Sequence, residues 1–519
     1  MRIIKKAVVI SLLAMILNTL AIVSTYAESA QDLSFTIVDG VEVITISQVA
    51  DNFNVEVEWD SINQTVNFTD LSESIRSVAI YYVGGFNDGI NVWLPLEFVT
   101  AFFSNGSLAE VHITDHGELA TAFITEMNDN LYNRVSFSYR ELEAAEWIVD
   151  ELLAMGFNES DIVTQSFGIS YLEEFEDGFR ADWFTEVVNS RANGGELVPE
   201  EFIRAWADSI YEQALADFAE AGFTYEMITY DLGMELSEFI ETYTVPALEG
   251  SFSMYGAFSD EVEFRQYSQN IILTIPGRSE QKIVLTAHYD TVYNTPGASD
   301  NASGVALLME SAYRMMDEDN YFTLVYAFVG AEEVGLVGAF YYHDNLSAEQ
   351  QANILVNINA DVLFEGPYFF VGAAQLKEEF VGLSRSELMW YAASGDGLME
   401  NDITHEAAQI AKRLNEQYGA KLIVHRELAA MPSDQLVFLI NGHTVIALTG
   451  LARYGDDAYT GFNFEVSPLT LYNDYFFGAS VVHSLYDDVH FINENWPDKI
   501  ANAMWTFSLL LDTLLAAEF

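Results

Sequence analysis

The segment that decides the fold is residues 283–312, which read IVLTAHYDTVYNTPGASDNASGVALLMESA. It opens with a mostly apolar run, Ile283 to Ala287, as expected of a strand that is buried on both faces. A turn follows, and then a helical pattern with apolar residues at Ala306, Leu307, Met309 and Ala312. A buried strand followed directly by a helix is the repeating unit of a parallel α/β sheet.

Three further stretches have the same character as the first strand. They are residues 323–329, 354–358 and 444–448, and helical patterns separate them. The sequence therefore predicts an α/β fold with a mostly parallel central sheet flanked by helices.

The length of the chain leaves room for more than this one domain. At about 150 residues per domain, 519 residues correspond to two to four domains. We expect a small α+β module over residues 33–113, where short alternating strands surround a short helix, and a main domain over residues 115–519. Residues 168–262 are acidic, helical in pattern and rich in aromatic residues, and we interpret them as an insertion or lid within the main domain.

The N-terminus has the three regions of a secretory signal peptide. Arg2, Lys5 and Lys6 precede an apolar run over residues 7–23, and Ala27 supplies a small residue for cleavage. We expect residues 1–27 to be removed and the protein to be secreted, in the medium or associated with the cell wall. An uncleaved membrane anchor is the alternative, but the run is short and polar near its end.

Composition excludes several classes of partner and site. Asp and Glu number 79 against 21 Lys and Arg, a net charge of −58, which argues against binding to nucleic acid or to an anionic membrane surface. The chain has no cysteine, so disulfides, thiolate zinc sites and cysteine nucleophiles are excluded. Any metal must be held by His, Asp or Glu.

Residues of that kind lie where the predicted strands end, which is where an open α/β sheet places its active site. They are His288, Asp290, Asp300, Glu332, Glu333, Asp361 and, far along the chain, His483. Most have a simple structural alternative, since Asp300 could cap a helix and Asp361 could form a turn. Two adjacent carboxylates at a buried strand end are harder to explain without a partner or a metal. His490 competes with His483 for the same role.

Taken in order, these residues resemble the motifs of the M28 family of zinc peptidases. The matching sequences are H-x-D at residues 288–290, D-N-A-S-G at 300–304, E-E-x-G-x-x-G at 332–338, Asp361 at its strand end and H-S-x-x-D at 483–487. Ser433 and Asp434, with Phe438, resemble a further segment of that family, although Gln435 stands where the family commonly has His. The resemblance covers residues 115–519 apart from the insertions.

The resemblance implies a role for each residue. Two zinc ions per chain would share Asp300, with Glu333 and His483 completing one site and His288 and Asp361 the other. Asp290 would orient His288, and Glu332 would be the general base acting on a metal-bridging water. A cis peptide bond between Asp300 and Asn301 is also implied. The expected activity is that of a zinc-dependent exopeptidase, a dizinc aminopeptidase acting on peptides with a free N-terminus.

Other readings remain open at this point. A carboxypeptidase or dipeptidase on the same fold would need a basic residue to bind the substrate carboxylate, and Arg385, Arg426 and Arg453 are the nearest candidates in sequence. A glutaminyl cyclase of the related type uses one zinc ion. A non-catalytic surface-binding protein would be expected to have lost a ligand or the base.

The module at residues 33–113 resembles the copper amine oxidase N-terminal-like domain. The likeness rests on the order strand, helix, strand and on a Trp-Asp pair at residues 59–60. In secreted bacterial proteins such modules act as accessory domains, which implies attachment to the cell surface and no copper site.

Overall fold

The computed structural model describes residues 116–173, 181–195, 197–220, 235–366, 368–380, 397–451 and 482–517, and six short strands between Val43 and Pro95. The expected signal peptide, with its cleavage site at Ala27, lies outside the described residues. Residues 195–253 form a compact unit of their own, distinct from the body that contains the central sheet.

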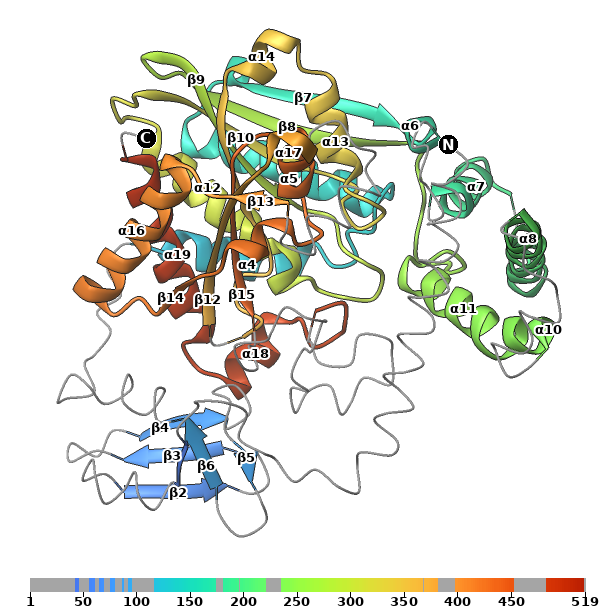
Figure 1. Cartoon of the computed structure of the whole chain (residues 1–519), viewed down its shortest axis with the longest axis horizontal. Helices are drawn as coiled ribbons and strands as arrows, with labels where there is room; N and C mark the ends of the chain where they lie inside the picture. The colour runs from blue at the N-terminus through green and yellow to red at the C-terminus, as the bar shows by residue number, and fades with distance from the viewer. Residues whose placement is uncertain are drawn as a thin grey trace. The chain divides into compact units, whose positions relative to one another are not determined.

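A nine-stranded mixed sheet is the centre of that body (Figure 1). Eight strands follow one another in the order β13 (Leu398–Met399), β12 (Tyr368–Leu376), β15 (Val445–Leu451), β11 (Ile354–Ala360), β9 (Ser279–His288), β10 (Phe322–Val329), β8 (Tyr267–Ile275) and β7 (Ile162–Gly168). The ninth, β14 (Leu422–Val424), pairs with β12.

The four strands expected from the sequence are the four adjacent strands at the middle of this sheet. β10, β9, β11 and β15 pair in parallel, while β8, β7, β12 and β13 run antiparallel to their neighbours in this order. β14 pairs in parallel with β12. The predicted α/β class with a mostly parallel centre is therefore confirmed. The strands β7 and β12 were not predicted, and β7 mixes exposed with buried positions and so lacks a continuous apolar run.

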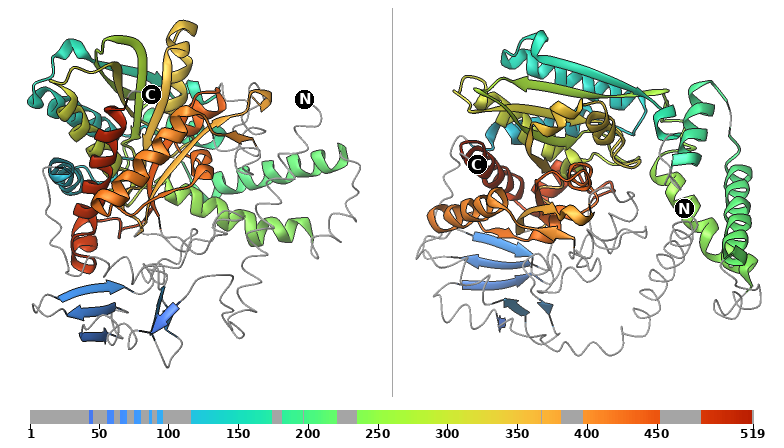
Figure 2. Two further views of the ribbon diagram at one scale, coloured as in Figure 1. Left: turned by 60° about the vertical axis from the view of Figure 1, so that its left-hand side comes forward. Right: turned by 45° about the horizontal axis from the view of Figure 1, so that its top comes forward.

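Helices cover both faces of the sheet (Figure 1, Figure 2). Ile283 and Leu285 of β9 point into a core shared with α4 (Glu118–Asn130), α5 (Tyr139–Met155), α12 (Ser303–Met315), α16 (Asp402–Tyr418) and α19 (Lys499–Leu515). Val284 belongs to a second core with α13 (Val337–Asp344) and α17 (Gln435–Ile440). Alternate side chains of one strand thus enter opposite layers, as the period of two requires.

Shorter helices complete the body. They are α6 (Ser170–Glu173), α7 (Ala181–Ala192), α14 (Ala348–Ala352) and α18 (Val489–Asn495). Helix α5 ends at Gly156, which has φ 108° and whose amide bonds to the last turn of the helix. No helix among the described ranges is both long and apolar enough to cross a membrane.

The segment that we expected to be a helical insertion contains helices throughout its described part. Within the unit of residues 195–253 these are α8 (Pro199–Glu220), α10 (Leu236–Phe239), a π-helical turn over Ile240–Thr244 and the start of α11 (Val245–Met254). A role of this segment as a lid stays a prediction.

The N-terminal strands form two small antiparallel sheets. One has the order β1 (Val43–Thr45), β6 (Val92–Pro95), β5 (Phe86–Asn87), and the other β2 (Glu56–Asp60), β3 (Thr65–Thr69), β4 (Ile75–Ala79). These short strands agree with the short alternating strands expected over residues 33–113. The short helix expected among them lies outside the described residues, so the likeness of the module to an accessory domain stays a prediction.

The start of α12 is fixed against the end of β11 through a glycine. The amide group of Asn301 donates to the main-chain oxygen of Ala360, and the amide of Gly304 donates to Oδ1 of Asn301, each at 2.9 Å. A Cβ at Gly304 would overlap the main-chain oxygen of Ala360. The close approach places Asp300 beside Asp361, the residue after Ala360.

We predict that Gly304→Ala destabilises the protein by about 1–3 kcal/mol, because the added methyl group must push the helix away from the strand. Equilibrium unfolding in urea measures this. Gly168→Ala is the control, since its methyl group would meet nothing closer than 3.4 Å. Equal stability of the two variants would contradict the packing argument.

Candidate metal centre

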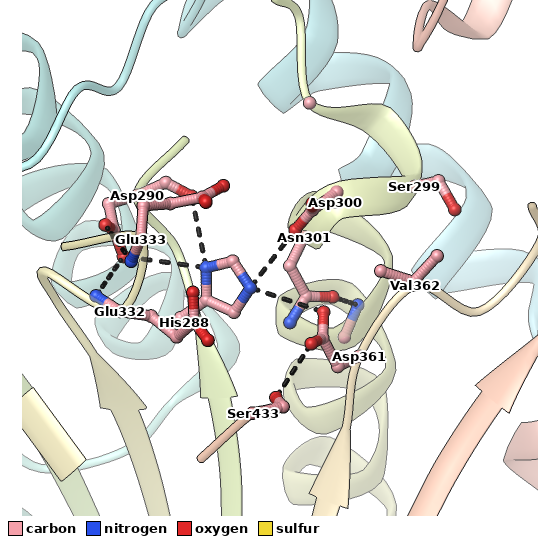
Figure 3. Close-up of polar contacts among 12 residues, drawn as sticks. His288, Asp290, Ser299, Asp300, Asn301, Glu332, Glu333, Asp361, Val362 and Ser433 are labelled. Atoms are coloured by element: carbon pink, nitrogen blue, oxygen red, sulfur yellow. Dashed lines mark hydrogen bonds and ion pairs between the residues drawn. The ribbon is translucent and has the colours of Figure 1, made fainter. Parts of the chain in front are cut away.

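Three neighbouring strands deliver ligand-type residues to one edge of the sheet. His288 is the last residue of β9, Glu332 and Glu333 follow β10, and Asp361 follows β11. Because the carboxyl ends of parallel strands meet at the same edge, these side chains converge there (Figure 3). Asp300, in the turn Ala298–Ala302 that precedes α12, reaches the same place.

Asp300 lies between two histidines and faces each with a different oxygen. Its Oδ1 is 3.1 Å from Nε2 of His288, and its Oδ2 is 3.0 Å from Nε2 of His483. The side chain is almost fully buried. One carboxylate placed in this way can serve two neighbouring cations, which is the arrangement of a bridging ligand.

Each half of the cluster has a third member. On one side, Nε2 of His288 is 3.3 Å from Oδ1 of Asp361, and on the other, Nε2 of His483 is 3.2 Å from Oε2 of Glu333. The ligand atoms of His288, Asp300 and Asp361 lie within 4.8 Å of one another, and so do those of Asp300, Glu333 and His483. The structure thus brings together every residue that the sequence assigned to metal binding.

The charges of the cluster fit a cation. Burial disfavours the charged form of His483, but the carboxylates of Glu333 and Asp300 outweigh it and raise its pKa well above the usual value. Oε1 of Glu333 is buried and has no hydrogen-bond partner among the described residues. Histidine nitrogens and carboxylate oxygens without thiolates form a donor set that suits zinc.

Glu332 and Glu333 are adjacent but differ in exposure. The side chain of Glu333 is buried, whereas that of Glu332 is partly exposed. Burial, together with the nearby charges of Glu333 and Asp434, raises the pKa of Glu332 well above its usual value. A partly exposed carboxylate with a raised pKa can exchange protons with a bound molecule, and a buried one is better suited to holding a metal.

Two buried carboxylates hold the turn that carries this pair. Oε1 of Glu141 accepts from the amide of Ala331 at 3.0 Å, and Asp290 accepts from the amides of Glu332 and Glu333 at 3.0 and 3.2 Å. Asp290 also accepts from the hydroxyl of Ser136 at 2.6 Å. Three consecutive amides therefore point at fixed acceptors, which sets the direction of both glutamate side chains.

The imidazole of His288 is oriented through Nδ1, the ring nitrogen that does not face Asp300 and Asp361. Nδ1 lies 3.2 Å from the main-chain oxygen of Asp290 and 3.5 Å from its carboxylate (Figure 3). A proton on Nδ1 leaves Nε2 as the acceptor that faces Asp300 and Asp361. The orienting contact expected from Asp290 is thus present, with the main-chain oxygen as its closer atom.

The turn around Asp300 is held by a second set of buried groups. Asp487 accepts from the amides of Ser299 and Asp300 at 2.6 and 2.9 Å. The guanidinium of Arg134, which is fully buried, donates to the main-chain oxygens of Tyr289, Pro296 and Gly297. The peptide bond between Asp300 and Asn301 is cis, as the resemblance implied.

Residues beside the ligands have a left-handed backbone. Ala331, Val362 and His483 have φ of 57°, 53° and 62°. The conformation is unfavourable for a β-branched residue such as Val362, and costs roughly 1–2 kcal/mol. The amide of Gly450 donates to its main-chain oxygen at 2.8 Å and holds it in place. Such backbone is typical of a site whose geometry is imposed by the surrounding fold.

Residues 433–435, where Gln435 stands in place of the histidine common in the M28 family, support Asp361. Ser433 donates to Oδ2 of Asp361 at 2.7 Å, and the amide of Asn359 donates to Ser433 and to Gln435. Gln435 therefore belongs to a buried polar chain behind the cluster. Next to it, both carboxylate oxygens of Asp434 are buried without a partner among the described residues, and burial raises its pKa to about 8.

The structure separates the two competing histidines. His490 pairs with Asp129 on the surface at 2.7 Å and lies outside the cluster, whereas His483 is part of it. The contributions of Ser136, Glu141 and Arg134 were missed because none of these residues belongs to the motifs at the strand ends. Arg134 could have been singled out in the sequence, because the chain has only 21 Lys and Arg residues.

Comparison with known proteins agrees with the resemblance of the sequence motifs to the M28 family. Residues 270–508 match the family described as "Peptidase family M28", and this range contains all seven residues named above. Similar curated proteins include "Aminopeptidase YwaD" of Bacillus subtilis (strain 168), 37% identical over 101 residues, which are 19% of this chain and 22% of that protein. "Aminopeptidase Y" of Saccharomyces cerevisiae is 33% identical over 123 residues, 24% of this chain and 23% of that protein.

These matches span about a quarter or less of each relative. Among solved structures, a zinc aminopeptidase from Bacillus subtilis, BSAP, has a TM-score of 0.43 and 15% identity, covering 78% of this chain and 95% of its own.

We predict that divalent metal stabilises the fold, because in its absence the carboxylates of Asp300, Glu333 and Asp361 repel one another. At free zinc 100-fold above its Kd the gain is about 2.7 kcal/mol. This corresponds to a rise in Tm of roughly 3 °C for a domain of about 400 residues, because the unfolding entropy grows with chain length. Calorimetry with zinc and after chelation measures the shift. A Tm that does not respond to chelation would contradict the assignment of a metal centre.

Proposed function

We propose that this chain is a secreted zinc aminopeptidase, which hydrolyses the first peptide bond of peptides that have a free N-terminus. The observation that carries the proposal is the placement of Asp300 between two histidines, with one further carboxylate on each side. The match of residues 270–508 to an M28 peptidase and the aminopeptidase names of similar proteins support it.

In this proposal the chain holds two zinc ions. Asp300, Glu333 and His483 would hold one, and His288, Asp300 and Asp361 the other. When bound, the pair of ions polarises the scissile carbonyl and lowers the pKa of water. The protein keeps the ligands in place through the amides fixed by Asp290, Glu141 and Asp487.

Glu332 would be the general base. Its carboxylate is partly exposed beside the cluster, and its raised pKa favours taking up a proton and then returning it to the leaving amine. The amide of Glu332 is fixed by Asp290, so the side chain starts from a defined position. No nucleophilic side chain is needed in such a mechanism.

The alternative of a carboxypeptidase requires a cation to bind the carboxylate of the substrate. Arg426 pairs with Glu427 at 2.7 Å, and the guanidinium of Arg134 is buried and bonds to main-chain oxygens. The other two candidates, Arg385 and Arg453, lie outside the described residues. Arg426 and Arg134 are thus both engaged with groups of the protein, and the excess of carboxylates at the site favours recognition of an amine.

Location and partners are part of the proposal. The N-terminal signal pattern supports secretion, and the strands between Val43 and Pro95 would belong to a module that attaches the protein to the cell surface.

We predict that Glu332→Gln lowers kcat by about 10²–10⁴-fold with the metal content unchanged, because the proton acceptor is lost while the ligands remain. Release of the first amino acid from one peptide, offered with a free and with an acetylated N-terminus, measures the activity. Only the free form should be cleaved, and chelation should abolish cleavage.

Glu280→Gln is the matched control, since Glu280 is exposed on β9, at the end opposite His288. It should retain full activity. Release of residues from the C-terminal end would show a carboxypeptidase instead, and no release from either end would contradict the proposal.

A further inference from the structure

The loop after Asp361 leads to a glutamate whose main chain is fixed on all sides. The amides of Leu363 and Phe364 donate to the hydroxyls of Ser303 and Ser299, at 3.1 and 3.4 Å. The amide of Gly366 donates to the main-chain oxygen of Gly450 at 2.9 Å. Glu365, between them, is thus held beside the turn that carries Asp300.

The main-chain oxygen of Glu365 is satisfied by a hydrogen bond, but its side chain is not fully satisfied by the described residues. It is 7% exposed, and its Oε1 is buried without a hydrogen-bond partner among the described residues. Nζ of Lys499 donates to the main-chain oxygen of Glu365 at 2.8 Å. A buried carboxylate oxygen without a partner is costly, so it calls for a partner that the described residues do not supply, and a bound ligand is one such partner.

Glu365 follows Phe364, whose amide donates to the hydroxyl of Ser299, the residue before Asp300. The charges of Lys499, Asp487, Asp300 and His483 all act on its carboxylate, whose pKa burial raises to about 8. It is neither a member of the ligand groups nor a contact of one in the described structure. The carboxylate is therefore close to the reacting centre but has no role in building it.

We propose that Glu365 is a specificity-determining residue that binds the positively charged side chain of an N-terminal lysine or arginine. This inference rests on the proposed aminopeptidase function. Burial raises the pKa of Glu365 to about 8, so in the empty site the group is largely protonated at neutral pH. A cationic donor placed against it favours the ionised form, and an ion pair in a partly dehydrated site is strong. The net charge of −58 also attracts basic peptides.

The test compares two substrates that differ only in charge. Peptides that begin with lysine and with norleucine have side chains of similar length, and only lysine carries the ammonium group. We expect the full-length enzyme to have a higher kcat/KM for the lysyl peptide. Glu365→Gln should lower that value by roughly 10- to 100-fold and change the norleucyl value by less than about threefold.

Controls separate recognition from folding. Glu494→Gln removes the same charge from an exposed position on α18 and should leave both rates unchanged. Glu365→Asp keeps the charge and should keep part of the lysyl preference. If Glu365→Gln fails to fold, the wild-type ratio of lysyl to norleucyl rates still decides, because a preference for norleucine overturns the proposal.

Two further outcomes overturn it. An equal loss for both peptides in Glu365→Gln would mean that the residue binds the α-ammonium group or supports the fold, and no loss for either would mean that it binds nothing. If the wild-type enzyme cleaves neither peptide, the aminopeptidase function itself fails, and this inference fails with it.

Discussion

The contact on which the rest of the site depends is that of Asp300 with its two histidines. Each oxygen of this buried carboxylate faces one imidazole Nε2, at 3.1 and 3.0 Å, and Asp361 and Glu333 stand on either side. Several carboxylates so close together repel one another unless cations lie between them. The raised pKa of both histidines is the response of the protein to the same excess of negative charge.

Buried carboxylates that accept main-chain amides keep this arrangement in place. Glu141 and Asp290 fix the amides of Ala331, Glu332 and Glu333, and Asp487 fixes the turn at Asp300. The ligands are thereby positioned by the sheet and by the turns around it. This explains how a left-handed backbone can persist at Ala331, whose amide is held by Glu141.

Local patterns predicted the central strands and the ligands, because each strand is a continuous apolar run that ends in a polar motif. The antiparallel edge strands could not be predicted in this way, since β7 is half exposed and its pairing depends on residues about 100 positions away. The choice between His483 and His490 likewise depends on tertiary contacts. Glu365 carries no motif, and only its burial in the folded chain sets it apart.

Metal content tests the central claim, that Asp300 is shared by two metal ions, most directly. Elemental analysis of the purified full-length protein, equilibrated with zinc and then freed of loosely bound ions, should give about two ions per chain. Asp361→Ala should retain about one, and Asp300→Ala should lose nearly all of both. A single ion in the wild-type protein, or unchanged metal content in Asp300→Ala, would contradict the account.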